Sequence, residues 1–369
     1  MHKLYQFISS DDERMKKPLL GTRHVVKVIQ DPDPKTGKLL TKKVLEEDYQ
    51  WTTLSQAADE AASFGRGLCQ LGVQPRSKVA IFAETRQEWL VAAMGCFRHS
   101  VALCTLYTNL GSDAIKYAIE LTEVQLVITS QELFPKLASC LDKLGNVKSV
   151  VVFEDKHLGS LPENVESVNP KVGQKVDLVS FEEVVKLGKY ADVSVTPPEP
   201  SDPAVIMFTS GSTGVPKGVV QLHSNLIATL KNVLALLSNT PLREDDTYIA
   251  FLPLAHILEF IMENCAFLVG VKVGYSSPYT LTDNSTSVVK GSKGDLTVLK
   301  PTQMSSVPMI LDRIYKGIVS KVESTGPIGS AIFNFAVKYR IYWESHGYKT
   351  PLLDRILFGP LRKVLTGGK

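Results

Sequence analysis

A run of small polar residues between an apolar strand and a helix is the part of the sequence whose residue types best suit chemistry. Residues 209–218 read Thr-Ser-Gly-Ser-Thr-Gly-Val-Pro-Lys-Gly, and seven of these ten are serine, threonine or glycine. Glycines let backbone N–H groups turn toward an anion, and hydroxyl groups donate further hydrogen bonds. Lys217 adds a positive charge. The run therefore predicts a phosphate-binding loop.

The loop differs from the common phosphate-binding motifs. A Walker A loop requires G-x-x-x-x-G-K-[ST], whereas Lys217 is preceded by Pro216 and followed by Gly218. The loop does not fit the dinucleotide pattern G-x-G-x-x-G either. A flexible Ser/Gly loop without a ligand is the alternative for such a run. The ordered series, with proline and lysine at fixed offsets after a strand, argues against that alternative.

Short apolar segments alternate with helical patterns on both sides of the loop. Before it, helices of 10–15 residues separate strands that we predict at residues 78–83, 101–106, 124–129 and 147–153. A strand at 204–208 directly precedes the loop. After the loop we predict a helix at 222–237 and further strands at 247–251 and 271–275. This alternation predicts an α/β fold with two doubly wound sheets, parallel or mixed.

A proline-rich connector divides the two sets of elements. Residues 196–203 read Thr-Pro-Pro-Glu-Pro-Ser-Asp-Pro, and proline is compatible with neither a helix interior nor a central strand. The first fifty residues are charged and rich in turn residues. We therefore predict an N-terminal extension at 1–50, a first α/β subdomain at 51–196, and a second at 197–369 that contains the phosphate loop.

Composition excludes several classes of protein. The 41 basic and 38 acidic residues give a net charge of +3, which is too even to indicate a nucleic-acid partner. Five cysteines without a C-x-x-C pair predict reduced thiols and no metal site. No segment has the ~18 uninterrupted apolar residues of a transmembrane helix. Basic residues at 338–340 and 355–363 are interpreted as solvated faces, with peripheral membrane contact as the alternative. No feature of the sequence indicates an oligomeric state.

The loop, read in order, resembles the signature T-S-G-S-T-G-x-P-K-G of the adenylate-forming superfamily at every defined position. Residues 248–259 resemble the Y-x-x-x-L-P-L-A-H-x-L-E segment of long-chain fatty acid–CoA ligases (acyl-CoA synthetases). Residues 84–89 and 105–111 match their E-T-R-x-E-W and T-L-Y-x-x-L-G segments. Residues 291–302 are similar to the animal branch that prefers polyunsaturated and other long-chain acids. The resemblance runs from about Leu20 to Lys369.

This resemblance implies ATP-dependent activation of a long-chain fatty acid to acyl-CoA through an acyl-adenylate, with Mg²⁺ and coenzyme A. It implies that His256 lies at the acyl-carboxylate and adenylate site, that Phe260 gates the acyl pocket, and that Val307 and Pro308 line it. A capping role for His256 and plain core packing for Phe260 are the alternatives. The residues that it implies as holding the phosphates of ATP or the departing pyrophosphate are Thr209, Ser210, Gly211, Ser212, Thr213, Gly214 and Lys217.

The resemblance also implies segments that these 369 residues do not contain. They are the Y-G-x-T-E-type segment with a magnesium-binding glutamate, the T-G-D segment that binds ribose, and a small C-terminal domain with a catalytic lysine. We therefore expect an incomplete large N-terminal domain, inactive and marginally stable alone. A non-catalytic truncated product that binds fatty acid, nucleotide or a partner is the alternative function. For the full-length enzyme, we expect a cytosol-facing site at the endoplasmic reticulum, lipid droplet or mitochondrial outer membrane.

Overall fold

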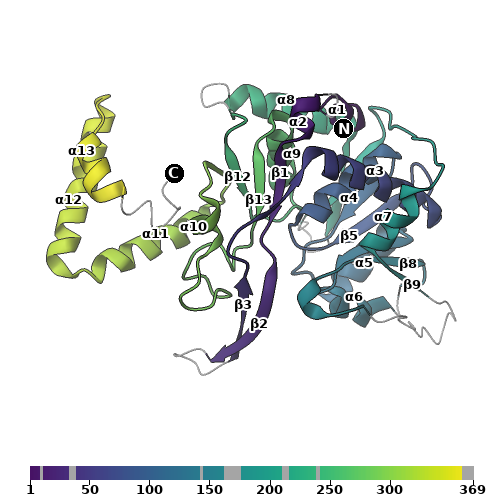
Figure 1. Ribbon diagram of the computed structural model, residues 1–369, viewed down its shortest axis with the longest axis horizontal. Coiled ribbons are helices and arrows are strands. Elements are labelled where there is room, and N and C mark those ends of the chain that lie inside the picture. The colour runs from purple at the N-terminus through teal and green to yellow at the C-terminus, as the bar shows by residue number, and fades with distance from the viewer. Residues whose placement is uncertain are drawn as a thin grey trace.

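The computed structural model describes residues 1–8, 11–32, 39–141, 144–161, 176–209, 216–237 and 242–359. Within these residues the chain forms two large β-sheets, a two-stranded hairpin and helices that cover both sheets (Figure 1). One continuous apolar core joins the inner faces of the two sheets through the helices between them. The fold is therefore a layered α/β structure, as the alternation of strands and helices predicts.

The larger sheet has seven strands within the described ranges, in the order β11-β10-β6-β5-β7-β8-β9. All neighbouring strands in it run parallel except β10 and β11, which are antiparallel. Its strands are β5 (Lys78–Phe82), β6 (Ala102–Thr105), β7 (Leu126–Ser130), β8 (Ser149–Phe153), β9 (Asp177–Ser180), β10 (Pro203–Thr209) and β11 (Lys217–Leu222). The associated helices are α3 (Leu54–Gln70), α4 (Gln87–Arg98), α5 (Ser112–Thr122), α6 (Phe134–Leu141) and α7 (Phe181–Lys189).

The smaller sheet has five strands in the part of the chain that the structure describes, in the order β14-β12-β13-β1-β4. Its first strand along the chain, β1, runs parallel to β13, with Leu20 opposite Val273. Its strands are β1 (Pro18–Thr22), β4 (Gln50–Thr53), β12 (Thr247–Ala250), β13 (Lys272–Tyr275) and β14 (Gln303–Met304). The helices α1 (His2–Ile8), α8 (His223–Leu236), α9 (Ile257–Val269) and α10 (Asp295–Leu299) accompany it, and β2 (Val25–Pro32) pairs with β3 (Leu39–Leu45) as a separate hairpin.

Strand periodicity sorts the side chains of the larger sheet between two cores. On β5, Val79 and Ile81 point into the core shared with the smaller sheet, whereas Ala80 and Phe82 point into a second core with α5 and α6. Successive side chains of a strand point to opposite faces, and both faces of this sheet are covered. This explains why its strands are apolar throughout instead of alternating.

Local sequence signals set the ends of the helices that matter most here. Thr53 and Gln56 form a reciprocal capping box at the start of α3, with N–H···O distances of 3.2 and 2.8 Å. Gly270 ends α9 in the left-handed region, with φ of 88°, where glycine carries no steric penalty. Both ends follow from sequence rules that need no tertiary contact.

The strands predicted on both sides of the phosphate loop are confirmed to within two residues at each end. The two sheets, however, cut across the boundaries predicted after residues 50 and 196. β10 begins at the end of the proline-rich connector yet pairs with β6 of the larger sheet, and β11 pairs with β10. β1 and β4, from the first 53 residues, belong to the smaller sheet. A connector interrupts the alternation of strands and helices along the sequence, but it need not mark the edge of a sheet. Strands that are far apart in the sequence can still be hydrogen-bonded neighbours.

The last described elements leave the two-sheet body. Helices α11 (Pro308–Glu323), α12 (Gly326–Ser345) and α13 (Pro351–Leu353) extend away from it, which Figure 1 shows in yellow-green and yellow. Several of their apolar side chains are exposed, among them Met309, Ile328 and Phe335. Within the described ranges, no helix combines the length and apolar character needed to cross a membrane.

Candidate active site

A cavity of about 490 Å³ opens where strands of both sheets end. The segments that follow β5, β6, β12 and β13 all contribute to its wall, and so does the start of α11. Crevices at the carboxyl ends of parallel strands are where open α/β sheets bind ligands. The lining residues are Ala83, Glu84, Thr85, Tyr107, Thr108, Asn109, Phe251, Leu252, Pro253, Ala255, His256, Leu258, Glu259, Ser276, Ser277, Pro278, Tyr279, Val307, Met309 and Ile310.

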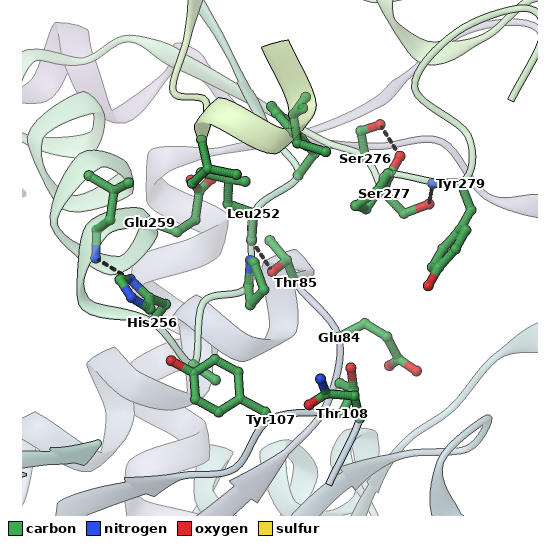
Figure 2. Close-up of a pocket in the computed structure, with 18 of the residues that line it drawn as sticks. Glu84, Thr85, Tyr107, Thr108, Leu252, His256, Glu259, Ser276, Ser277 and Tyr279 are labelled. Carbon is green, nitrogen blue, oxygen red and sulfur yellow. Dashed lines mark hydrogen bonds between the residues drawn. The ribbon is translucent and has the colours of Figure 1, made fainter. Parts of the chain in front are cut away.

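Two threonines of the larger sheet hold the segment that leads into α9. The Thr85 hydroxyl donates to the Leu252 carbonyl at 2.6 Å and accepts from the Leu254 N–H at 2.9 Å (Figure 2). The buried Thr105 hydroxyl donates to the Ala255 carbonyl at 3.0 Å. These contacts satisfy backbone groups of a non-helical stretch and lock the two sheets together at the cavity.

His256 lies on the cavity wall as the N-cap of α9. Its Nδ1 accepts a hydrogen bond from the Leu258 N–H at 3.2 Å, and its ring centroid is 6.5 Å from that of Tyr107 (Figure 2). An Nδ1 that accepts cannot carry the proton, so the neutral ring carries it on Nε2. The capping bond therefore leaves Nε2–H as a donor for a ligand, at the positive end of the α9 dipole.

Burial changes the protonation of two other groups on the wall. It raises the pKa of the Glu84 carboxyl above its usual value, which favours the neutral acid. It also raises the pKa of the Tyr107 phenol, which therefore stays protonated and able to donate a hydrogen bond. The shift of Glu84 therefore favours a less negative wall, whereas the Tyr107 phenol adds no charge.

A buried ion pair supports the opposite wall of the cavity. Arg23 Nη1 lies 3.1 Å from Asp295 Oδ1, and the side chains are only 4% and 3% exposed. Asp295 Oδ2 accepts from the Ser276 and Thr280 hydroxyls at 2.7 and 2.5 Å. Ser276 and its neighbours up to Tyr279 line the cavity, so Asp295 holds this loop in place.

The predicted phosphate loop is described only at its two ends. Thr209 pairs with Lys217 in the antiparallel ladder of β10 and β11, so the loop is the connection of a hairpin. β10 runs parallel to β6, with Met207 opposite Thr105, and therefore ends at the sheet edge where the cavity lies. Lys217 is exposed. The remaining loop residues of the prediction, Ser210, Gly211, Ser212, Thr213 and Gly214, lie outside the described residues.

The predicted acyl-pocket residues separate into two groups. Val307 lies on the cavity wall, whereas Pro308 begins α11 and is absent from the wall among the described residues. Phe260 lies fully buried in the central core, with ring centroids 5.9 Å from Trp89 and 6.3 Å from Phe97. Phe260 thus packs in the core, which was the alternative to a gate. Leu258 and Glu259 are the α9 residues that reach the wall, and Phe260 is turned into the interior.

Several wall residues have roles that sequence reasoning did not assign. Thr85 and Tyr107 belong to matching sequence segments, but nothing in those segments indicates their contacts. Ser276 and Tyr279 are not marked by any motif. A usable signal exists for all four, because each follows a buried apolar strand at its carboxyl end.

The donor set does not fit a metal ion in the described part of the chain. No group of three or more histidine, cysteine, aspartate or glutamate side chains is arranged there to hold one. Glu84 and Glu259 lie on the cavity wall, but burial raises the pKa of both carboxyls.

Comparison with known proteins decides the family. A family model described as AMP-binding enzyme matches residues 36–369. The chain belongs to the AMP-binding enzyme family. The chain is 37% identical over 369 residues to long chain acyl-CoA synthetase 8 of Arabidopsis thaliana. The match covers 98% of this chain and 50% of the relative. It is 32% identical over 364 residues to long-chain-fatty-acid–CoA ligase 2 of Schizosaccharomyces pombe, covering 96% and 51%.

The chain spans about half the length of the curated relatives it matches. Solved structures share its fold. The adenylation domain of a carboxylate reductase from Mycobacterium chelonae superposes with a TM-score of 0.70 at 17% identity, over 92% of this chain and 50% of that one. A putative long-chain-fatty-acid CoA ligase from Rhodopseudomonas palustris gives 0.59 at 16% identity, over 85% and 65%. The α/β fold is thus that of the N-terminal part of adenylate-forming enzymes.

Proposed function

We propose that the full-length protein activates long-chain fatty acids, first forming an acyl-adenylate from ATP and then an acyl-CoA. The observation that carries the proposal is the position of His256. It caps a helix at an apolar cavity, on the same side of the sheets as the base of the phosphate loop. The names of the relatives support fatty acids as the substrate and coenzyme A as the acyl acceptor.

The cavity suits a fatty acid in size and polarity. Its volume of about 490 Å³ lies within the usual range of small-molecule sites. Phe251, Leu252, Val307 and Ile310 give it an apolar wall, and burial of the acyl chain against them supplies binding free energy.

His256 would orient the carboxylate. Its Nε2–H and the N-terminus of α9 both favour a negative charge at this point. One carboxylate oxygen would then attack the α-phosphorus of ATP, and the bond from that phosphorus to pyrophosphate would break. We propose that Thr209, Lys217 and the loop between them hold the leaving pyrophosphate. Mg²⁺ is expected with ATP, but the residues described here assign it no ligands.

The finer assignments rest on the sequence segments given above. We propose a preference for polyunsaturated and other long-chain acids. We also propose a cytosol-facing location at the endoplasmic reticulum, lipid droplet or mitochondrial outer membrane, with peripheral membrane contact. The compartment differs among relatives, because two from Arabidopsis thaliana carry the word peroxisomal in their names.

The test is fatty-acid-dependent exchange of pyrophosphate into ATP, measured with the full-length protein. We expect exchange to require a long-chain fatty acid, and we expect His256→Ala to lower kcat/KM for the fatty acid by about 10²-fold, the usual effect of losing one donor to a developing charge. His346→Ala, at the residue that caps the end of α12, is the matched control and should leave exchange unchanged. Exchange without fatty acid dependence, or an unchanged His256→Ala variant, would refute the proposal. The non-catalytic alternative predicts no exchange at all.

A further inference from the structure

Helix α9 contains two glutamates one turn apart that are fully buried. Glu259 and Glu263 both have 0% of their surface exposed. Glu259 Oε2 accepts a hydrogen bond from the Tyr248 hydroxyl of β12 at 2.9 Å, and Glu263 Oε2 accepts one from the Tyr275 hydroxyl of β13 at 3.0 Å. Each carboxyl thus ties α9 to a different strand of the smaller sheet.

The second oxygen of each carboxyl has no donor. Among the described residues, neither Glu259 Oε1 nor Glu263 Oε1 has a hydrogen-bond partner, and no ion pair includes either side chain. The titratable groups that face the pair are phenols: Tyr248 from β12, Tyr275 from β13 and Tyr5 from α1. Burial raises the pKa of all three, so none supplies a charge.

Two buried carboxylates without a cation cannot both be ionised. Neighbouring like charges in a site of low polarity force at least one proton onto the pair. Burial raises the pKa of Glu259 to about 8. Burial and the adjacent Glu259 raise the pKa of Glu263 well above its usual range.

The pair lies directly behind the candidate catalytic histidine. His256 is the N-cap of α9, Glu259 is in its first turn, and Glu263 is in the next. The Phe260 N–H donates to the His256 carbonyl at 3.2 Å, so movement of the first turn would move the cap. One turn further on, Tyr5 donates to Asn264 Oδ1 at 2.6 Å, which anchors the far side of the helix.

We propose that Glu259 and Glu263 are positioning residues that act as a protonated carboxyl pair, holding the first turn of α9 on the smaller sheet and thereby holding His256 in register with the cavity. Loss of a proton from Glu259 leaves a buried negative charge whose second oxygen has no donor among the described residues. The free energy cost of burying that charge displaces the first turn and the imidazole with it. The inference rests on the proposed function only for the role of His256.

The test is the pH dependence of pyrophosphate exchange in the full-length protein between pH 6 and 9.5. We expect wild-type kcat/KM to fall about tenfold per pH unit above an inflection near pH 8. Glu259→Gln replaces the carboxyl by a neutral group of the same shape that accepts from Tyr248. In this variant the inflection should move to higher pH or vanish. Glu259→Leu, which removes the acceptor that ties the Tyr248 hydroxyl to α9, should be less active than Glu259→Gln at every pH.

Glu323→Gln on the exposed surface of α11 is the matched control and should keep the wild-type inflection. A wild-type profile that is flat through pH 9, or a Glu259→Gln profile with the wild-type inflection, would overturn the inference. A role in stability alone would change activity without moving the inflection.

A second measurement does not depend on activity. Hydrogen-exchange protection of the Leu258 and Phe260 amides, corrected for intrinsic rates, should fall above pH 8 in the wild type and persist in Glu259→Gln. Protection that is equal in both proteins at all pH values would also overturn the inference. If the amide protection behaves as expected but pyrophosphate exchange does not depend on fatty acid, the proposed function is wrong. The role of the carboxyl pair in holding the first turn of α9 is then still supported.

Discussion

Helices α9 and α12 are both rich in apolar residues, yet they have opposite surroundings. α9 lies between the sheets, and Phe260, Cys265 and Phe267 are essentially unexposed. α12 extends from the body, where Ile328 is 77% and Phe335 is 67% exposed (Figure 1). On α12, Ala336 is the buried residue among those described.

The difference shows that apolar content does not decide burial. A helix gains stability from the surfaces it packs against more than from its own propensity. For α9 these surfaces are β12, β13, α1 and α8. α12 instead packs on α11, and several of its rings contact one another, such as Tyr339 with Trp343 at 6.0 Å. Matched substitutions in the two regions test how much the surroundings contribute.

The largest contrast is expected from truncating one phenylalanine in each helix. Phe260→Ala removes a ring packed against Trp89 and Phe97, and it should lower the free energy of unfolding by about 3–5 kcal/mol. Phe335→Ala removes a ring that is mostly exposed already, and it should change that free energy by less than about 0.5 kcal/mol. Urea denaturation of the protein measures both changes. Equal losses would mean that α12 is packed as tightly as α9.

A smaller contrast is expected from one arginine in each region. Arg23→Leu leaves the buried Asp295 without its cation and should lower the free energy of unfolding by about 3 kcal/mol. This value lies at the lower end for broken buried ion pairs, because Ser276 and Thr280 still donate to Asp295. Arg340→Leu removes contacts to Glu344 and Asp354 at 2.7 and 2.8 Å, but these side chains are about a third exposed or more. It should cost under about 1 kcal/mol.

The two arginines are distinguished by thermal unfolding of each variant beside the wild type. The Arg23→Leu variant should also bind fatty acid more weakly, because Asp295 holds the loop from Ser276 to Tyr279 on the cavity wall. Arg340→Leu should leave binding unchanged. A stable Arg23→Leu variant would show that the hydroxyl donors alone neutralise Asp295.

Local sequence patterns predict the helices and strands well, but they do not predict which distant strands pair with one another. The apolar run at 78–83 and the strand-helix alternation that follows depend on neighbours in sequence, so the strands appear where expected. The parallel pairing of Leu20 with Val273 joins segments about 250 residues apart, and no local pattern marks it. β1 is short and lies among the charged, turn-rich first fifty residues, so the sequence pattern assigns it to the N-terminal extension.

The candidate site follows the same division. His256 could be singled out because residues 248–259, which include it, resemble a contiguous segment of long-chain fatty acid–CoA ligases. Arg23 and Asp295 are 272 residues apart, so the ion pair between them could not be predicted. For Phe260 the resemblance implies a gate and core packing is the alternative, and the sequence does not show which face of the helix meets the cavity. That depends on Trp89 and Phe97, which belong to another helix.

The smallest contrast concerns how stability depends on pH. A glutamate whose pKa is higher in the folded than in the unfolded chain keeps a proton that the unfolded chain has released. The free energy of unfolding is then greatest below the unfolded pKa of about 4.3 and falls as pH rises toward about 8. For one such proton the slope is about −1.4 kcal/mol per pH unit.

Replacing Glu259 by Gln should remove one proton's share of this slope, because the amide does not titrate. Replacing Glu344 on α12 by Gln removes an exposed carboxyl whose partner is Arg340, and it should leave the slope as it is. Urea midpoints at half-unit steps from pH 5 to 8 measure the slopes, and the difference between the two variants cancels all other titrating groups. If the two variants gave equal slopes, the buried pair on α9 would be ionised in the folded protein. The contrast between α9 and α12 would then rest on packing alone and not on the protonation of buried carboxyls.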